Sequence, residues 1–295
     1  MNIFRDWFLA SRPWSFTMTA ISVSVGSGLA SADGAFSWNL YLITLFCVIL
    51  LHGATNLIND YYDVKSGVDK VDVSTAQYRP HPLLEGRLKP VQVRNFSFFL
   101  YGLVLIGGLY LTVTRGWVIL VLGLIGAGAS VFYTAPPFKY KYSALGEFSV
   151  FLMWGPLMVE GAYYVQRQQF SQEAFWISIP FGALVALVLL INNVRDIAHD
   201  KRNSIKTLPI LIGKENGIRF YATLIMMAYL AILVMSLVGL LHLWSLIVLA
   251  SLPLAFRLLR QMEREVPDDA DARTAQLDTA FGVLLVLSLI LENVI

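Results

Sequence analysis

The chain has 295 residues, of which 57% are hydrophobic and 14% are charged, and its formal net charge is +2. Soluble domains carry roughly 25% charged residues, so this composition excludes an ordinary soluble protein and predicts a chain that crosses a membrane many times. A single cysteine, Cys47, excludes an intramolecular disulfide and a cysteine-ligated metal cluster.

Apolar runs of membrane length recur from one end of the chain to the other. A hydrocarbon core of about 30 Å needs about 20 apolar residues in each helix. The sequence therefore predicts an all-α, polytopic membrane bundle that forms one domain over residues 1–295, with no soluble domain left over. The expected spans cover residues 14–32, 39–58, 96–114, 117–135, 144–165, 174–193, 217–241, 243–259 and 277–295.

The distribution of basic residues predicts the orientation of these spans. If the amino terminus is cytoplasmic, all but two of the 22 Lys and Arg residues fall on that side, and only Arg115 and Arg167 lie outside. Cytoplasmic loops of membrane proteins are enriched in Lys and Arg, so this asymmetry favours the assignment. We expect an integral protein of the cell (inner) membrane with a cytoplasmic amino terminus. Because the number of spans is odd, its carboxyl terminus is expected outside.

Two similar acidic motifs end the second and sixth expected spans. The stretches "LINDYYD" (57–63) and "LINNVRD" (190–196) share Leu, Ile, Asn and the last Asp. Both spans run from outside to inside, so both motifs reach the same cytoplasmic interface. This correspondence predicts two parallel four-helix repeats, formed by spans one to four and five to eight, with one helix added.

The spacing of the acidic residues is typical of a metal site. Asp60 and Asp63 lie three residues apart, and Asp196 and Asp200 lie four apart, so each pair can share one face of a helix. Four carboxylates at one cavity mouth repel one another unless cations lie between them. Mg²⁺ takes carboxylate oxygens and usually bridges to substrate phosphates. The expected ligands of two Mg²⁺ ions are the catalytic residues Asp60, Asp63, Asp196 and Asp200, together with Asn59 and Asn192.

Basic and aromatic residues near these acids indicate a phosphorylated, apolar substrate. Arg and Lys donate to phosphate oxygens, and aromatic faces stabilise a carbocation. A phosphorylated head at the interface and an apolar tail among the helices describe a polyprenyl diphosphate. The expected diphosphate-binding residues are Asn59, Arg79, Lys141, Arg195, Lys201 and Lys206. The residues expected to line the substrate or its cation are Arg12, Tyr62, Tyr133, Trp154, Glu160 and Tyr164.

The segments that carry these residues resemble the UbiA superfamily of intramembrane prenyltransferases. The segment "GEFSVFLMWGPLMVEGAYYV" (146–165) is most similar to the branch that prenylates 1,4-dihydroxy-2-naphthoate in menaquinone synthesis. The likeness covers most of the chain and rests on "RPWSF" (12–16), "NDYYD" (59–63), "YTAPPFKYK" (133–141), "NNVRDIAHD" (192–200) and "KTL" (206–208).

The resemblance implies nine helices around a cavity that opens to the lipid, with Mg²⁺ and diphosphate held by both acidic motifs. It implies ionisation of the polyprenyl diphosphate to an allylic cation, capture by an electron-rich ring, and proton loss. In the naphthoate branch the ring carboxylate is also lost as CO₂. The expected partners are a polyprenyl diphosphate, an aromatic acceptor and the lipid bilayer, and no nucleic acid.

Three features of the sequence depart from the pattern of that branch. Ser204 and Ile205 follow the second motif where the branch has Gly and Lys, and Asp69 follows Asp63 by six residues where many relatives have four. Glu160 replaces a small or neutral residue. An ionisable group inside a span is a functional hypothesis by default, but Glu160 can instead hydrogen-bond a neighbouring helix.

Alternatives to the naphthoate reaction stay open at this point. Homogentisate, 4-hydroxybenzoate or glycerol phosphate as acceptor would keep the enzyme class. A secondary transporter or cation channel would also contain repeats and intramembrane acids, although its sites usually lie near the bilayer midplane rather than at one interface. The prenyl chain length and the oligomeric state are not predicted by the sequence.

Overall fold

A computed structural model describes residues 3–69 and 80–294 of the chain, and the described residues form helices and no strand. Short 3₁₀ turns at Pro13–Ser15 and Tyr140–Tyr142 join helices, and a longer one, Leu243–Ser251, leads into α13. In chain order the helices are α1 (Ile3–Ala10), α2 (Phe16–Ala32), α3 (Trp38–Lys65), α5 (Pro90–Arg115), α6 (Trp117–Phe132), α7 (Gly146–Leu152), α8 (Met158–Arg167), α9 (Gln172–Arg195), α10 (Ile197–Arg202), α11 (Leu208–Ile212), α12 (Lys214–Leu237), α13 (Leu252–Arg264) and α14 (Ala270–Val294).

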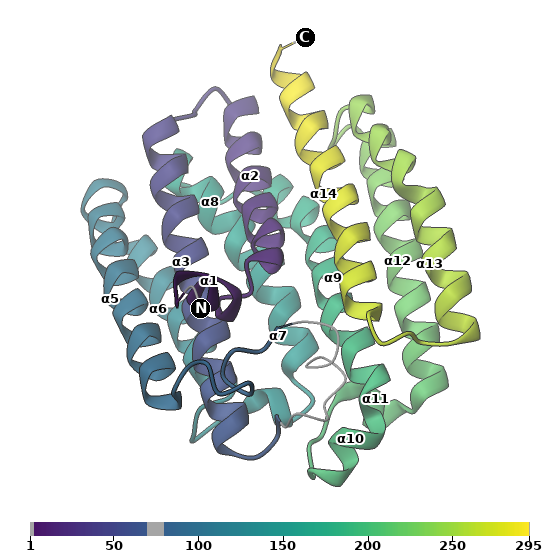
Figure 1. The fold of residues 1–295 in the computed structure, drawn as a ribbon. Coiled ribbons are helices and arrows are strands. Elements are labelled where there is room, and N and C mark those ends of the chain that lie inside the picture. The colour runs from purple at the N-terminus through teal and green to yellow at the C-terminus, as the bar shows by residue number, and fades with distance from the viewer. Residues whose placement is uncertain (1–2, 70–79, 295) are drawn as a thin grey trace.

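The long helices pack as two groups, and α14 lies between them (Figure 1). In the first group α3 packs on α5 and α2 packs on α8, while in the second α9 packs on α12. The last helix, α14, contacts both α2 and α9 and so closes the bundle between the two groups. The ends of α3 and α9 that carry the acidic motifs lie at the same end of the bundle as α10 and α11 (Figure 1).

Each of the nine expected spans overlaps helical structure within the described residues. Six helical stretches among the described residues are long and apolar enough to cross a membrane, which makes the protein an integral membrane protein. Those stretches are Trp38–Lys65, Pro90–Arg115, Gln172–Arg195, Lys214–Leu237, Leu243–Arg264 and Ala270–Glu292. The count of nine crossings stays a prediction, because α2, α6 and the α7–α8 region are shorter helices.

The fifth expected span is interrupted in its middle. A π-helical turn, Met153–Leu157, separates α7 from α8, and Gly155 within it has non-helical torsion angles of φ −82° and ψ −107°. Pro156 explains the break, because proline has no N–H to donate and its ring collides with the carbonyl of the preceding turn. The kink brings the backbone of Gly155 against Gly182 of α9, where a Cβ on Gly182 would lie 2.7 Å from the Cα of Gly155.

A second close approach, between α2 and α8, leads to a prediction about stability. A Cβ built on Gly26 would lie 2.1 Å from the backbone oxygen of Val159, and a backbone atom cannot rotate away. Gly26→Ala is therefore expected to destabilise the protein by about 1–3 kcal/mol, because the two helices must separate. The measurement is the midpoint of thermal unfolding in detergent.

Gly28 on the same helix provides the matched control. A Cβ at Gly28 would meet only side-chain atoms of Leu289, at 3.4 Å. Alanine also has the higher helix propensity, so Gly28→Ala should leave the midpoint unchanged or raise it. Equal midpoints for the two variants would contradict a close α2–α8 contact.

Candidate active site

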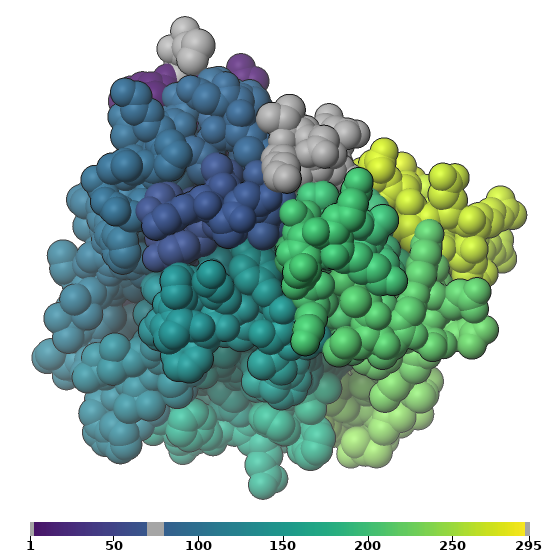
Figure 2. All heavy atoms as spheres, turned by 90° about the horizontal axis from the view of Figure 1, so that it is seen from below, coloured from purple at the N-terminus to yellow at the C-terminus, as the bar shows by residue number. Residues whose placement is uncertain are grey.

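A cavity of about 960 Å³ lies between α2, α3, α9 and α14. One part of its wall is apolar and includes Met18, Val188 and Leu284. The other part is polar and brings together residues of both acidic motifs, namely Asn59, Asp63, Asn192, Asp196 and Asp200. Figure 2 shows the end of the molecule that carries the two acidic motifs, where the end of α3, the loop after α6 and the α10–α11 segment lie side by side.

The first motif is held at the end of α3 by the loop that follows α6. The helix continues to Lys65, beyond the end of the apolar run, so Asn59 and Asp63 lie on its last turns. The Thr134 hydroxyl donates to Asn59 Oδ1 at 2.9 Å. The Lys141 ammonium donates to Asp63 Oδ2 at 2.7 Å, and the Tyr142 hydroxyl donates to its other oxygen. Asp63, which is only 2% exposed, therefore lies directly beside a cation at the cavity wall.

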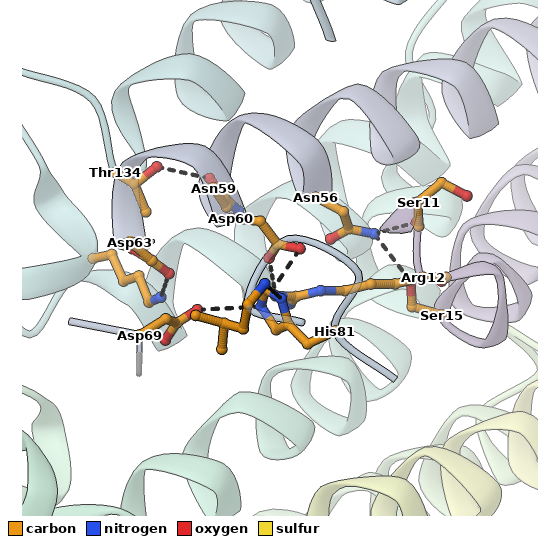
Figure 3. Close-up of polar contacts among 12 residues, drawn as sticks. Ser11, Arg12, Ser15, Asn56, Asn59, Asp60, Asp63, Asp69, His81 and Thr134 are labelled. Atoms are coloured by element: carbon orange, nitrogen blue, oxygen red, sulfur yellow. Dashed lines mark hydrogen bonds and ion pairs between the residues drawn. The ribbon is translucent and has the colours of Figure 1, made fainter. Parts of the chain in front are cut away.

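Asp60 points in another direction, as Figure 3 shows. Its carboxylate forms an ion pair with the guanidinium of Arg12, and its second oxygen lies 3.8 Å from His81 Nε2. The same imidazole nitrogen lies 3.6 Å from Asp69 Oδ2, so His81 links the first motif to Asp69. Arg12, Asp63 and Asp69 line the cavity directly, whereas Asp60 lies behind Arg12.

Neighbouring charges shift the pKa values of this cluster. Burial would lower the pKa of Arg12, but the charges of Asp60, Asp69 and Asp63 raise it. Burial would raise the pKa of Asp69, but the contact with His81 and the charges of Lys141 and Arg12 lower it to about 2. Burial would likewise lower the pKa of Lys141, and the charge of Asp63 raises it instead. Arg12, Asp69 and Lys141 therefore stay ionised near neutral pH.

In the second motif, Arg195 contacts protein acceptors instead of the cavity. Its guanidinium donates to both oxygens of Asp196, at 2.9 and 2.8 Å, and to Asn192 Oδ1. It also donates to the backbone oxygen of Asp268 and to Asp271 Oδ1, the latter at 3.1 Å. Asn192, Asp196 and Asp271 line the cavity, but Arg195 does not. Arg195, expected to bind diphosphate, thus orients three oxygen-bearing side chains.

The segment after the second motif is tied to the loop that carries Lys141. The backbone N–H of Ala144 donates to the oxygen of Lys206 at 2.8 Å, and the N–H of Lys206 donates to the oxygen of Tyr142 at 3.2 Å. The side chains of Lys201 and Lys206 are exposed and lie outside the cavity lining. Arg79, also expected to bind diphosphate, lies outside the described residues.

The expected substrate-lining residues divide into two sets. Arg12, Tyr133 and Trp154 line the cavity. Tyr62 packs in the apolar cluster around α3 and α5, and Tyr164 packs against Phe170 with tilted rings whose centroids lie 5.1 Å apart. Glu160 accepts a hydrogen bond from the backbone N–H of Ser171 at 3.2 Å and so caps the start of α9. The three residues of this second set do not line the cavity.

Sequence reasoning did not single out several residues of the site. Asp271 and Tyr142 line the cavity, and His81 Nε2 lies 3.8 Å from Asp60 Oδ2 and 3.6 Å from Asp69 Oδ2. Asp271 lies at the start of α14, 71 residues beyond Asp200, in a polar segment without a motif. A usable signal was its position just before the last expected span, at the end of the bundle that both acidic motifs share.

The residues of this cavity fit Mg²⁺. Carboxylate and amide oxygens are the donors that hard cations prefer, and Mg²⁺ combines a few of them with waters and phosphate oxygens. Asn59, Asp63 and Asp69 supply such oxygens from one side, and Asn192, Asp196, Asp200 and Asp271 supply them from the other.

Mg²⁺ binding is expected to weaken as the pH falls below about 6. Burial, and then the charge of Asp196, raise the pKa of Asp200 to about 6. Below that pH a proton occupies the carboxylate and must leave before a cation binds, so the affinity falls up to about tenfold per pH unit, and above it the affinity levels off. Calorimetric Mg²⁺ titrations across this pH range measure the slope. Asp200→Asn should remove the slope, and equal wild-type affinities at about pH 5 and pH 7 would contradict the assignment.

This chain is similar to proteins of the UbiA prenyltransferase family in sequence and in fold. The sequence pattern of the UbiA prenyltransferase family matches residues 19–285. The chain is 29% identical over 289 residues to the 1,4-dihydroxy-2-naphthoate octaprenyltransferase of Bacillus subtilis (strain 168), covering 96% of this chain and 91% of that protein. It is 34% identical over 292 residues to UbiA prenyltransferase domain-containing protein 1 of Rattus norvegicus, covering 97% and 83%. The solved structure of a UbiA homologue from Archaeoglobus fulgidus bound to GPP and Mg²⁺ matches the fold with a TM-score of 0.68 at 15% identity, covering 98% of this chain and 100% of that one.

Proposed function

The chain belongs to the UbiA prenyltransferase family, and on that premise we propose that it transfers a polyprenyl group from polyprenyl diphosphate to 1,4-dihydroxy-2-naphthoate. Family membership makes the protein a prenyltransferase and sets aside a transporter or channel. The Bacillus subtilis relative is named as a 1,4-dihydroxy-2-naphthoate octaprenyltransferase, which supports this acceptor.

The observation that carries the proposal is the composition of the large cavity. Its polar end joins oxygen ligands from both acidic motifs with the ammonium of Lys141, and its other wall is apolar. Such a cavity suits a molecule with an anionic head and a hydrocarbon tail, as a polyprenyl diphosphate has. When bound, Mg²⁺ would neutralise the diphosphate and so make it a better leaving group.

The residues of the chain have separate tasks in the proposed reaction. Lys141 and Arg12 stabilise the charge that develops on the diphosphate as the bond between prenyl carbon and oxygen breaks. That bond's electron pair leaves with the diphosphate. The faces of Tyr133 and Trp154 attract the allylic cation, and the surrounding helices exclude water that would capture it.

Atoms and charge balance in this transfer. A ring carbon of the naphthoate forms a bond to the prenyl cation and loses its proton. Loss of CO₂ leaves an electron pair on the ring, which takes up one proton. The products are the prenylated dihydroxynaphthalene, CO₂ and diphosphate, and no net proton is released from the ring.

The orientation in the membrane belongs to the same proposal. We place the amino terminus and the cavity mouth on the cytoplasmic side of the cell membrane and the carboxyl terminus outside, because nearly all Lys and Arg residues then face the cytoplasm. Residues 1–295 act as one catalytic unit with nine crossings, and two Mg²⁺ ions per site accompany the two acidic motifs.

Detergent-purified protein incubated with polyprenyl diphosphates of mixed length and a panel of acceptors, with and without Mg²⁺, tests the proposal. Mass spectrometry should find a Mg²⁺-dependent adduct of dihydroxynaphthoate that is lighter by CO₂. An adduct on homogentisate, 4-hydroxybenzoate or glycerol phosphate alone would overturn the acceptor and keep the enzyme class. Activity without Mg²⁺ would overturn the metal requirement.

A further inference from the structure

A second, smaller cavity adjoins the first. It has a volume of about 340 Å³ and lies between α3, α5, α6 and the kinked α7–α8 region. The two cavities meet at residues that line both of them, namely Arg12, His52, Asn56, Asn59, Tyr133, Val150 and Trp154. A group in the smaller cavity would therefore lie beside the first acidic motif, next to a group in the larger one.

Hydroxyl groups form one wall of this second cavity. Thr55 donates its one hydroxyl hydrogen to the backbone oxygen of Leu51 at 2.7 Å. In the hydrogen bond between the Thr55 and Ser130 hydroxyls, Ser130 is therefore the donor. Ser130 in turn accepts from Tyr101, which lies behind it. Thr55 is four residues from Asn59 on α3, a rise of about 6 Å along the helix. The hydroxyl wall thus lies about one helical turn from the first motif.

A second chain of hydroxyls continues the wall on the other side. Ser149 donates to the Tyr140 hydroxyl at 3.1 Å, and Tyr140 donates to the backbone oxygen of Ala129. Each hydroxyl hydrogen in the two chains is thus committed to a protein acceptor. Lone pairs remain on Thr55, Ser130, Tyr140 and Ser149, because a hydroxyl carries two of them. The wall therefore offers acceptors to a ligand and has no free donor.

The chemistry of this wall identifies the ligand it would take. A ring with phenolic O–H groups brings donors and matches the wall, whereas a quinone brings only carbonyl acceptors and matches nothing in it. Away from this wall the lining is apolar at Leu51, Leu122 and Met153, while Thr44 and the junction residues Arg12, His52, Asn56 and Asn59 are polar. The volume lies at the lower end of the ~300–1,000 Å³ range of small-molecule pockets, which suits a bicyclic ring, while a long prenyl tail needs the larger cavity.

We propose that the second cavity is the acceptor site, where phenolic hydroxyls of the aromatic substrate donate to the Thr55–Ser130 and Ser149–Tyr140 walls while the prenyl diphosphate occupies the first cavity. This inference rests on the proposed prenyl transfer and adds where the acceptor binds and in which redox state. The ring carbon then meets the prenyl carbon at the junction beside Asn59, Tyr133 and Trp154.

Removing the hydroxyls tests the wall. Thr55→Val and Ser130→Ala each delete one acceptor, and the expected result is a KM for the acceptor raised about tenfold, with the KM for the prenyl diphosphate unchanged. Thr112→Val is the matched control, since its hydroxyl also donates to a carbonyl four residues earlier, that of Gly108, and it lines neither cavity. Unchanged acceptor KM values in both variants would overturn the proposal.

A blocking variant separates the two cavities even if a hydroxyl variant fails to fold. A Cβ at Gly126 would meet only side-chain atoms of Leu51 and Leu157, at 3.8 and 4.0 Å, so Gly126→Leu extends into the second cavity. We expect this variant to lose prenyl transfer and to retain Mg²⁺-dependent binding of a prenyl thiodiphosphate. Gly128→Leu, on the same helix and outside both linings, is the control. Loss of thiodiphosphate binding in Gly126→Leu would place the donor in this cavity and overturn the proposal.

Inhibition of the wild-type protein tests the redox state. With dihydroxynaphthoate varied, 1,4-naphthalenediol should compete at least about tenfold more strongly than 1,4-naphthoquinone, which lacks donors. Equal inhibition would overturn the role of the wall. The acceptor is first identified by turnover of the wild-type protein. If the wild-type protein forms no product with any acceptor, the proposed function is wrong. If the variants form product with unchanged KM values for the acceptor, only the assignment of the second cavity is wrong.

Discussion

Asp63→Asn is expected to abolish prenyl transfer, with a loss of at least about 100-fold in kcat/KM. Residues that merely support metal ligands typically cost 10–100-fold when removed, so a residue that faces the metal and the diphosphate should cost more. Asp63 is 2% exposed and accepts from Lys141 at 2.7 Å and from Tyr142. Asparagine keeps the shape but not the charge, so the Lys141 ammonium loses its counter-ion and the cation loses a ligand. Asp196→Asn should fail in the same way, because Asp196 lines the opposite side of the cavity.

A control variant at a third buried aspartate distinguishes the loss of a cavity-lining carboxylate from the loss of a buried carboxyl group elsewhere in the protein. Asp278 on α14 is 0% exposed, neither of its carboxylate oxygens has a hydrogen-bond partner among the described residues, and it lines neither cavity. Asp278→Asn should therefore keep full turnover and equal or higher stability, since an unpaired buried carboxyl is costly. Kinetics at saturating Mg²⁺, with unfolding midpoints for all three variants, make the comparison. Turnover of folded Asp63→Asn near the wild-type level would refute the role of the first motif.

Hydropathy predicted the positions of the helices better than their ends or breaks. A run of about 20 apolar residues has few alternatives to a helix in a membrane, because every backbone polar group must be satisfied internally. The expected span ends at residue 58, where the apolar run stops, while α3 continues as one helix through the polar motif to Lys65. Polarity marks where a helix leaves the lipid and does not mark where it ends. The break at Pro156 was missed because the residues on both sides of it are apolar.

The acidic residues of the site were predictable, while the partners of the basic residues were not. Two similar acidic motifs at the ends of two expected spans predicted one shared cavity, and Asp63, Asp196 and Asp200 do line it. Arg12 contacts Asp60 from 48 positions away, and Arg195 contacts Asp271 from 76 positions away. Such pairings depend on how distant helices pack, so no local pattern contains them. The partner of Glu160 was unpredictable for a similar reason, because its hydrogen bond with the backbone N–H of Ser171 depends on the turn between α8 and α9.

Replacing Arg195 is expected to disable the second motif without removing any residue from the cavity wall. Its planar guanidinium donates to Asn192, Asp196 and Asp271 at once, and a single ammonium cannot reproduce this geometry. Arg195→Ala should lower kcat/KM by about 10–100-fold, and Arg195→Lys should recover little of it. Arg273→Ala is the matched control, because Arg273 pairs with Asp269 at the exposed surface of the same region and lies outside the cavity lining.

The Mg²⁺ dependence decides how Arg195 acts. If Arg195 orients the oxygens of Asn192, Asp196 and Asp271, its loss should raise the Mg²⁺ concentration needed for half-maximal rate, and high Mg²⁺ should restore part of the activity. If it binds diphosphate directly, the KM for the prenyl diphosphate should rise while the Mg²⁺ requirement stays at its wild-type value. The geometry favours the first result, because both oxygens of Asp196 already accept from this guanidinium at 2.8–2.9 Å and Arg195 is absent from the cavity wall. A change confined to the KM for prenyl diphosphate would therefore contradict the positioning role.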